Sequence, residues 1–99
     1  MRLTPHQIEA IRQTVKDLAG STARVWLFGS RVDDQRRGGD VDLLVQVDSP
    51  VAEPAALAAR LSAKVSRSMY GRRVDVLLQA PNLMKSPIHQ IAMAQGVRL

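Results

Sequence analysis

The chain has 99 residues, which suits one compact domain and is too short for two. It has no cysteine, which excludes disulfides, thiolate metal sites and a cysteine nucleophile. Fourteen lysines and arginines against nine acidic residues give a net charge of +5, which suits a nucleotide, a nucleic acid or an acidic protein as partner.

The first predicted element is a helix over residues 4–19. Thr4 and Gln7 have the spacing of a capping box, Pro5 suits the first helical position, and Gly20 ends the helix. Its apolar side chains fall on one stripe: Ile8, Ile11, Val15 and Leu18.

Three apolar strands are predicted over residues 24–28, 40–47 and 73–78. A second helix begins at Pro54 and runs to about Met69, with an apolar residue at every fourth position, and a short helix over 86–94 is the last element. This order predicts an α/β fold in which helices cover a small mixed sheet, with 1–99 forming a single domain.

Two acids open the second strand, Asp40 and Asp42, directly after a Gly-Gly turn. Residues two apart in a strand point to the same face, so their carboxylates project together with Cα atoms about 6.5 Å apart. Like charges in such a pair need a positive partner, and Mg²⁺ typically binds one or two carboxylates together with substrate phosphates. The alternative is a pair of solvated acids at a strand end.

Asp75 lies in the third apolar strand, where an unpaired carboxylate would be costly to bury. Strand periodicity puts Asp75 on one face with Leu77 and Gln79. If this strand lies beside the preceding one, three carboxylates converge as in a two-metal site. The alternative is an ion pair with Arg72, Arg73 or another arginine.

Gly29, Ser30 and Arg31 follow the first strand directly, at the start of a polar loop over residues 29–39. Backbone N–H groups at such a turn can hold phosphate, and an arginine there can brace phosphates or pair with a carboxylate. The alternatives are an ordinary turn and a solvated arginine.

Other residues have simpler interpretations. We expect Trp26 and Phe28 in the core, and Arg60, Lys64 and Arg67 on a solvated face of the second helix, with contact to an acidic partner or nucleic acid as the alternative.

Gly29-Ser30, a polar spacer and Asp40-Val41-Asp42 together resemble the signature of the DNA polymerase β-type nucleotidyltransferase superfamily. The run FGSRVDDQRRGGDVDLLV at residues 28–45 resembles the minimal members, the MNT domain proteins, and the resemblance covers the whole chain. The spacer of nine residues is shorter than usual in that pattern, which a loop tolerates at little cost. The resemblance implies a polymerase β-like nucleotidyltransferase fold.

By that resemblance, Asp40 and Asp42 would bind the Mg²⁺ ions that hold the triphosphate. Asp75 would complete the metal site and help to deprotonate the acceptor hydroxyl. Phosphate would be held by the residues after the first strand, Gly29, Ser30 and Arg31. The implied reaction is in-line attack on the α-phosphorus of ATP, with AMP transferred and pyrophosphate released.

Minimal members paired with helical HEPN proteins act as antitoxins by adding AMP to a tyrosine near the active site of the partner RNase. The resemblance therefore implies a HEPN-type toxin as partner and a hetero-oligomer. A rival interpretation is a non-catalytic module that neutralises a toxin by steric contact. A third, a small nucleic-acid binder, has only the net charge in its favour, because stacking aromatics and a reading motif are missing.

The N-terminal sequence turns polar too early for a signal peptide, and no apolar run approaches the roughly 20 residues of a membrane helix. We therefore expect a soluble protein of the cytoplasm.

Overall fold

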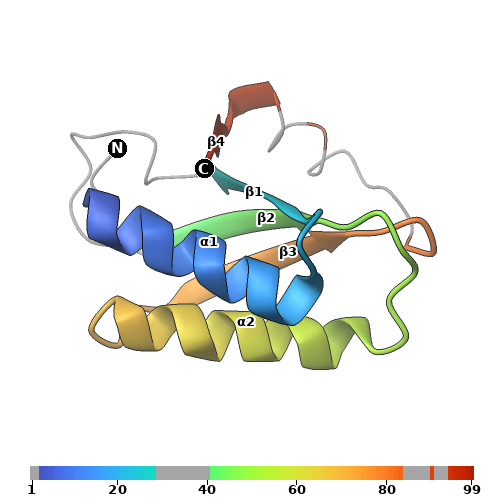
Figure 1. Ribbon diagram of the computed structural model, residues 1–99, viewed down its shortest axis with the longest axis horizontal. Coiled ribbons are helices and arrows are strands. Elements are labelled where there is room, and N and C mark those ends of the chain that lie inside the picture. Colours follow the sequence, from blue (N-terminus) through green and yellow to red (C-terminus); the bar gives the residue numbers. More distant parts are fainter. Residues whose placement is uncertain (1–2, 29–40, 84–89, 91–93) are drawn as a thin grey trace.

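The computed structural model describes residues 3–28, 41–83, 90 and 94–99. Its elements in chain order are α1 (Pro5–Ala19), β1 (Arg24–Phe28), β2 (Val41–Gln46), α2 (Pro54–Ser68), β3 (Val74–Gln79) and β4 (Val97–Arg98) (Figure 1). The predicted α/β class is confirmed.

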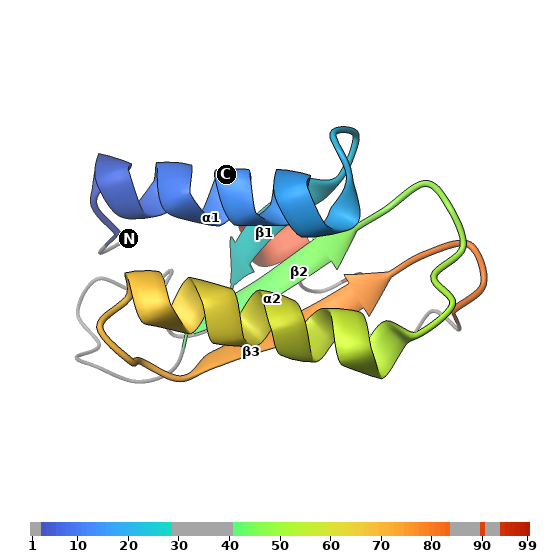
Figure 2. The same ribbon diagram turned by 60° about the horizontal axis from the view of Figure 1, so that its bottom comes forward.

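The four strands form one sheet in the order β3-β2-β1-β4. β2 and β3 run parallel, whereas β1 is antiparallel to both of its neighbours, β2 and β4. Both helices lie on the same face of the sheet (Figure 2). The small mixed sheet covered by helices is therefore confirmed.

The core lies between this sheet face and the two helices, because each element presents its apolar side chains there. The apolar faces of both helices are buried as predicted: Ile11 and Val15 are buried on α1, and Leu61 and Val65 are buried on α2. The strands contribute alternate residues, among them Val25, Leu27, Val41, Leu43, Val45, Val74 and Leu78.

The start of α1 shows the predicted capping box. The Thr4 hydroxyl accepts a hydrogen bond from the Gln7 backbone N–H at 3.1 Å, and the Gln7 side-chain oxygen accepts one from the Thr4 N–H at 3.0 Å. Pro5 occupies the first helical position, where it removes no helical hydrogen bond.

In the described part of the chain, no helix is both long and apolar enough to span a bilayer.

The structure corrects one expectation about β1 and adds a strand that was not predicted. Trp26 and Phe28 are half-buried on the face turned away from the helices, because their strand neighbours Val25 and Leu27 occupy the core face. β4 was not predicted, since two residues carry no periodic pattern. Most of the predicted helix at 86–94 lies outside the described residues; of that range, residues 90 and 94 are described, and both are helical.

Candidate functional site

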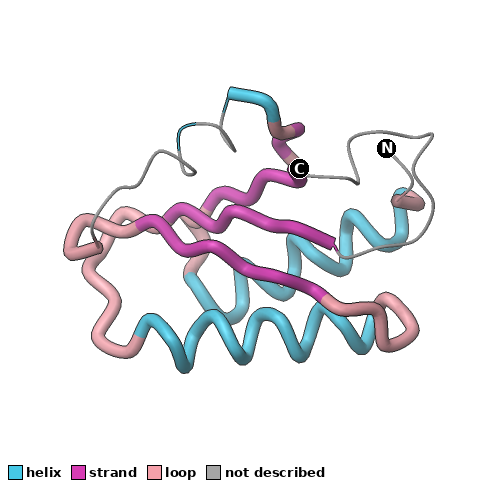
Figure 3. The backbone as a smooth tube through the Cα atoms, turned by 180° about the vertical axis from the view of Figure 1, so that it is seen from behind, coloured by secondary structure: helices cyan, strands magenta, loops and turns pink. Residues whose placement is uncertain are grey.

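The register of β2 against β3 places two acidic residues side by side. The strands are parallel and Asp42 is the partner of Asp75, so the spacing of neighbouring strands separates their Cα atoms by about 4.8 Å. Both side chains lie on the face turned away from the helices, because their strand neighbours Val41, Leu43 and Val74 are buried in the core. The two strands are adjacent, which meets the condition set for bringing these acids together, and Figure 3 shows them running next to each other.

An apolar row lies next to the acid pair on this face. Phe28 of β1 is the register partner of Asp42. The next residues on the same face, Trp26 of β1, Leu44 of β2 and Leu77 of β3, are register partners across the three strands. Leu44 is fully buried. Asp42 is half-buried, whereas the Asp75 side chain is 48% exposed. The acids therefore stand at the boundary between an apolar surface and solvent.

The cost of burying an unpaired carboxylate does not arise for Asp75, because its side chain is exposed on β3, at the edge of the sheet. The ion pair considered as the alternative is present: Arg73 Nε lies 3.3 Å from Asp75 Oδ1. Both side chains are well exposed, so this pair contributes little to stability. An exposed carboxylate at this position is accessible to a ligand.

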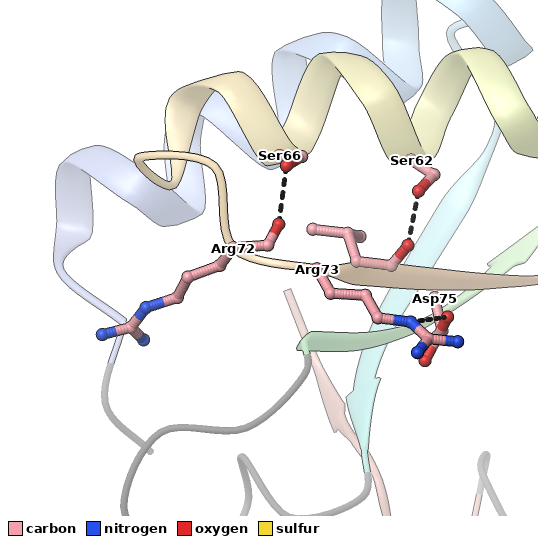
Figure 4. A network of polar contacts seen from close by, with 6 residues as sticks. Ser62, Ser66, Arg72, Arg73 and Asp75 are labelled. Carbon is pink, nitrogen blue, oxygen red and sulfur yellow. Dashed lines mark hydrogen bonds and ion pairs between the residues drawn. The ribbon is translucent and has the colours of Figure 1, made fainter.

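The backbone that carries Asp75 is held by α2 and β2. The Ser62 hydroxyl donates to the Val74 carbonyl, and the Ser66 hydroxyl donates to the Arg72 carbonyl at 2.6 Å (Figure 4). The Arg73 carbonyl accepts from the Val41 N–H at 2.9 Å. Three successive carbonyl groups before Asp75 are thus all hydrogen-bonded, which fixes where β3 begins. Sequence analysis missed both serines, because a hydroxyl on a helix matches no motif.

The other predicted site residues, Asp40, Gly29, Ser30 and Arg31, lie outside the described residues, and their roles stay predictions. Within the described ranges, no group of three or more His, Cys, Asp or Glu side chains could hold a metal. The two acids that are described, Asp42 and Asp75, nevertheless fit Mg²⁺, which prefers hard oxygen ligands and typically takes one or two carboxylates together with phosphates.

Basic side chains are exposed directly before β3, next to the acids, and on α2, which covers the opposite face of the sheet. Arg72 and Arg73 directly precede β3, and both are exposed. Along α2, Arg60, Lys64 and Arg67 are exposed as predicted for a solvated face. Positive charge of this kind attracts phosphates and acidic surfaces.

A second basic region lies away from the acid pair. A groove between α1, β1 and β4 is lined by four cationic side chains, Arg12, Lys16, Arg24 and Arg98. Arg24 is engaged with Asp48 at 2.7 Å and Arg98 stacks over the Trp26 ring at 5.8 Å. This groove contains neither Asp42 nor Asp75, so it is separate from the candidate site.

A comparison with curated proteins finds no match to this chain. The nucleotidyltransferase domain family, in contrast, matches residues 8–95 and so includes most of α1, the sheet strands β1 to β3, and both acids of the site. The general activity of that family is the transfer of a nucleotidyl group from a nucleoside triphosphate, for which a paired-carboxylate site is suited. The chain belongs to the nucleotidyltransferase domain family.

Proposed function

We propose that the chain is a Mg²⁺-dependent nucleotidyltransferase that moves AMP from ATP to a tyrosine hydroxyl of a helical HEPN-type RNase toxin and so acts as its antitoxin. One observation carries the catalytic part: Asp42 and Asp75 are register partners on one sheet face, in a chain of the nucleotidyltransferase domain family.

In the proposed reaction, the acceptor oxygen bonds to the α-phosphorus of the triphosphate while the bond from that phosphorus to the β-phosphate bridging oxygen breaks. Pyrophosphate leaves, and the hydroxyl proton passes to Asp75. Asp40 and Asp42 would hold Mg²⁺, which neutralises phosphate charge, and Asp75 would complete that site. Gly29, Ser30 and Arg31 would hold the remaining phosphates. Catalysis would come from positioning and charge neutralisation.

The partner part of the proposal rests on the resemblance to minimal nucleotidyltransferases paired with HEPN proteins, and the exposed cations support it. Asp75 is accessible from solvent, so the hydroxyl of a second protein can approach it. The exposed arginines directly before β3, Arg72 and Arg73, suit an acidic protein surface around the acceptor. The competing function is a non-catalytic antitoxin that binds its partner without transferring nucleotide.

The test is transfer of label from a triphosphate labelled at its α-phosphorus to a co-purified HEPN-type partner, with ATP compared against the other three nucleotides. Mass spectrometry of the partner should show the added mass of AMP on a tyrosine. We expect Asp42→Asn to abolish transfer, because the amide removes the charge that binds the metal.

Asp48→Asn is the matched control. It makes the same charge change at the other end of the β2 region, where Asp48 pairs with Arg24 on the surface. Transfer lost in Asp42→Asn and retained in Asp48→Asn supports the proposal. Transfer that persists in Asp42→Asn refutes the assignment of this site, and partner binding without any transfer would favour the non-catalytic alternative.

A further inference from the structure

We propose that Tyr70, in the turn between α2 and β3, is the aromatic anchor of a docking surface that binds an acidic face of the partner protein. The inference rests on the proposed function, because the partner is taken to be the protein that accepts the nucleotide. It concerns how that protein is held and involves no group of the metal site.

Tyr70 occupies a backbone position that suits glycine. α2 ends at Ser68, and Tyr70 follows the C-cap residue Met69 with a φ of 59°. The Gly71 N–H donates to the Ser66 carbonyl at 2.9 Å, which is a hydrogen bond of the Schellman motif. The residue at the place of Tyr70 in that motif is usually glycine, because a Cβ atom costs free energy at positive φ.

The fold gains nothing from the Tyr70 ring in return for this strain. Tyr70 is 96% exposed, whereas the other two aromatic residues, Trp26 and Phe28, are half-buried on β1. Among the described residues, the Tyr70 side chain forms no hydrogen bond and no ring contact. A strained position that carries a solvent-exposed ring indicates a role outside the folded monomer, and tyrosine is among the residues that bind most strongly in protein interfaces.

The turn holds Tyr70 in one place. Met69, directly before it, is 1% exposed and packs in the core. The Ser66 carbonyl accepts from the Met69 N–H at 3.0 Å, and the Ser66 hydroxyl donates to the Arg72 carbonyl at 2.6 Å. A tyrosine on a fixed backbone has only two side-chain torsions left to order, so it loses little conformational freedom when it binds.

The charge around Tyr70 specifies an acidic partner. Residues 54–74 contain five lysines and arginines and no acidic residue. Arg67, in the last turn of α2, and Arg72 are both exposed, and in the described part of the chain neither side chain forms an ion pair or a hydrogen bond. Positive charge on both sides of the ring in the sequence complements an acidic protein surface.

A protein fits this surface better than a nucleic acid does. Single-stranded nucleic acid is held by several aromatic rings on which successive bases stack. The chain has only three aromatic residues, of which Tyr70 alone is mostly exposed, and Trp26 is already stacked with Arg98. One exposed tyrosine with arginines near it has the composition of a protein interface.

The docking surface lies within reach of the acid pair. Tyr70 and Asp75 are five positions apart, so their Cα atoms are separated by at most about 18 Å. Figure 2 shows the α2–β3 turn and the start of β3 at the same end of the molecule. A standard interface buries about 800 Å² on each partner, a patch about 30 Å across. A protein held at Tyr70 can therefore also present a hydroxyl to Asp75.

The first experiment measures binding of the co-purified HEPN-type protein by isothermal titration calorimetry. We expect Tyr70→Gly to raise Kd about 10- to 100-fold, as for the loss of an interface anchor. Tyr70→Phe is the matched control, since it keeps the ring, and should stay within about threefold of the wild type. Unchanged binding in Tyr70→Gly, or an equal loss in Tyr70→Phe, would overturn the proposal.

Thermal unfolding of the same variants separates docking from a structural role. Tyr70→Gly should raise Tm by about 2–8 °C, because glycine relieves the backbone strain, and Tyr70→Phe should leave Tm unchanged. Weaker binding by a more stable protein is the signature of the proposed role. A lower Tm in Tyr70→Gly would show that the ring supports the fold and would overturn the proposal.

Arg72→Glu tests whether the partner surface is acidic. Its control is Arg12→Glu on α1, which makes the same charge change at another exposed arginine. Figure 4 shows the Arg72 side chain directed away from Asp75, so the acid pair is spared. At low salt, Arg72→Glu should weaken partner binding about fivefold and Arg12→Glu less than twofold. Equal effects of the two variants would overturn the assignment of an acidic partner to this surface.

A random single-stranded oligonucleotide is the probe for the competing kind of partner. Oligonucleotide binding that Tyr70→Gly weakens, with binding of the HEPN-type protein unchanged, would make the surface a nucleic-acid site and overturn the proposal.

Asp42→Asn separates this inference from the proposed function. We expect Asp42→Asn to lose AMP transfer and to bind the partner like the wild type. If it does so while Tyr70→Gly also binds like the wild type, only the docking surface is wrong. If transfer persists in Asp42→Asn while Tyr70→Gly loses the partner, the docking surface stands and the catalytic site is wrong. If the wild type does not bind the HEPN-type protein, both ideas fail.

Discussion

Replacing Ser62 by alanine tests how firmly α2 holds the strand that carries Asp75. The Ser62 hydroxyl donates to the carbonyl of Val74, a buried residue at the start of β3. Its removal leaves that carbonyl without its partner in a place that water reaches poorly, so we expect the free energy of unfolding to fall by about 1–2 kcal/mol. The Ser66 bond to the Arg72 carbonyl is exposed, and water can replace it, so Ser66→Ala should cost only about 0.5 kcal/mol.

Thermal unfolding followed by far-ultraviolet circular dichroism is the assay. For a domain of this size, each kcal/mol changes Tm by about 4–8 °C, so Ser62→Ala should lower Tm by about 4–16 °C and Ser66→Ala by about 2–4 °C. Ser68→Ala is the control, because the Ser68 hydroxyl donates to the Val65 carbonyl within its own helix and joins no second element. Equal Tm values for Ser62→Ala and Ser68→Ala would refute the proposed anchoring.

Three further predictions concern the core, the first helix and the metal. Leu43→Ala removes a fully buried side chain from the central strand pair and should cost about 3 kcal/mol in urea unfolding; a cost below about 1 kcal/mol would contradict the assigned core. Thr4→Ala breaks the capping box and should cost about 1 kcal/mol, whereas an unchanged urea midpoint would show that the cap contributes nothing. Chelation by EDTA should stop nucleotidyl transfer, and added Mg²⁺ should restore it; transfer that continues in EDTA would exclude a metal-dependent reaction.

Local sequence patterns predicted most of the fold, because helix caps and apolar stripes depend on residues that are close together in the sequence. The capping box and apolar stripe located α1 to within one residue, and Pro54 marked the start of α2. β4 was missed because its two residues form a strand only by pairing with β1, a contact between distant parts of the chain. Trp26 was misplaced because residue type was given more weight than strand alternation, which puts it opposite Leu27.

The candidate site was predictable in part. Periodicity assigned Asp75 to the face of Leu77 and Gln79, but its pairing with Asp42 depends on the register between β2 and β3, which is a tertiary property. The exposure of Asp75 follows from the edge position of β3, which no local pattern indicates. For the same reason, sequence alone left Arg73 as one of several candidate ion-pair partners of Asp75.

The most direct test of the central claim is a crystal structure with Mn²⁺ and a non-hydrolysable nucleoside triphosphate analogue. The account predicts anomalous density for Mn²⁺ about 2.1 Å from carboxylate oxygens of Asp42 and Asp75, with the triphosphate bound to the same ion. Manganese and nucleotide bound at another place, with Asp42 and Asp75 still contacting only protein groups and water, would contradict it.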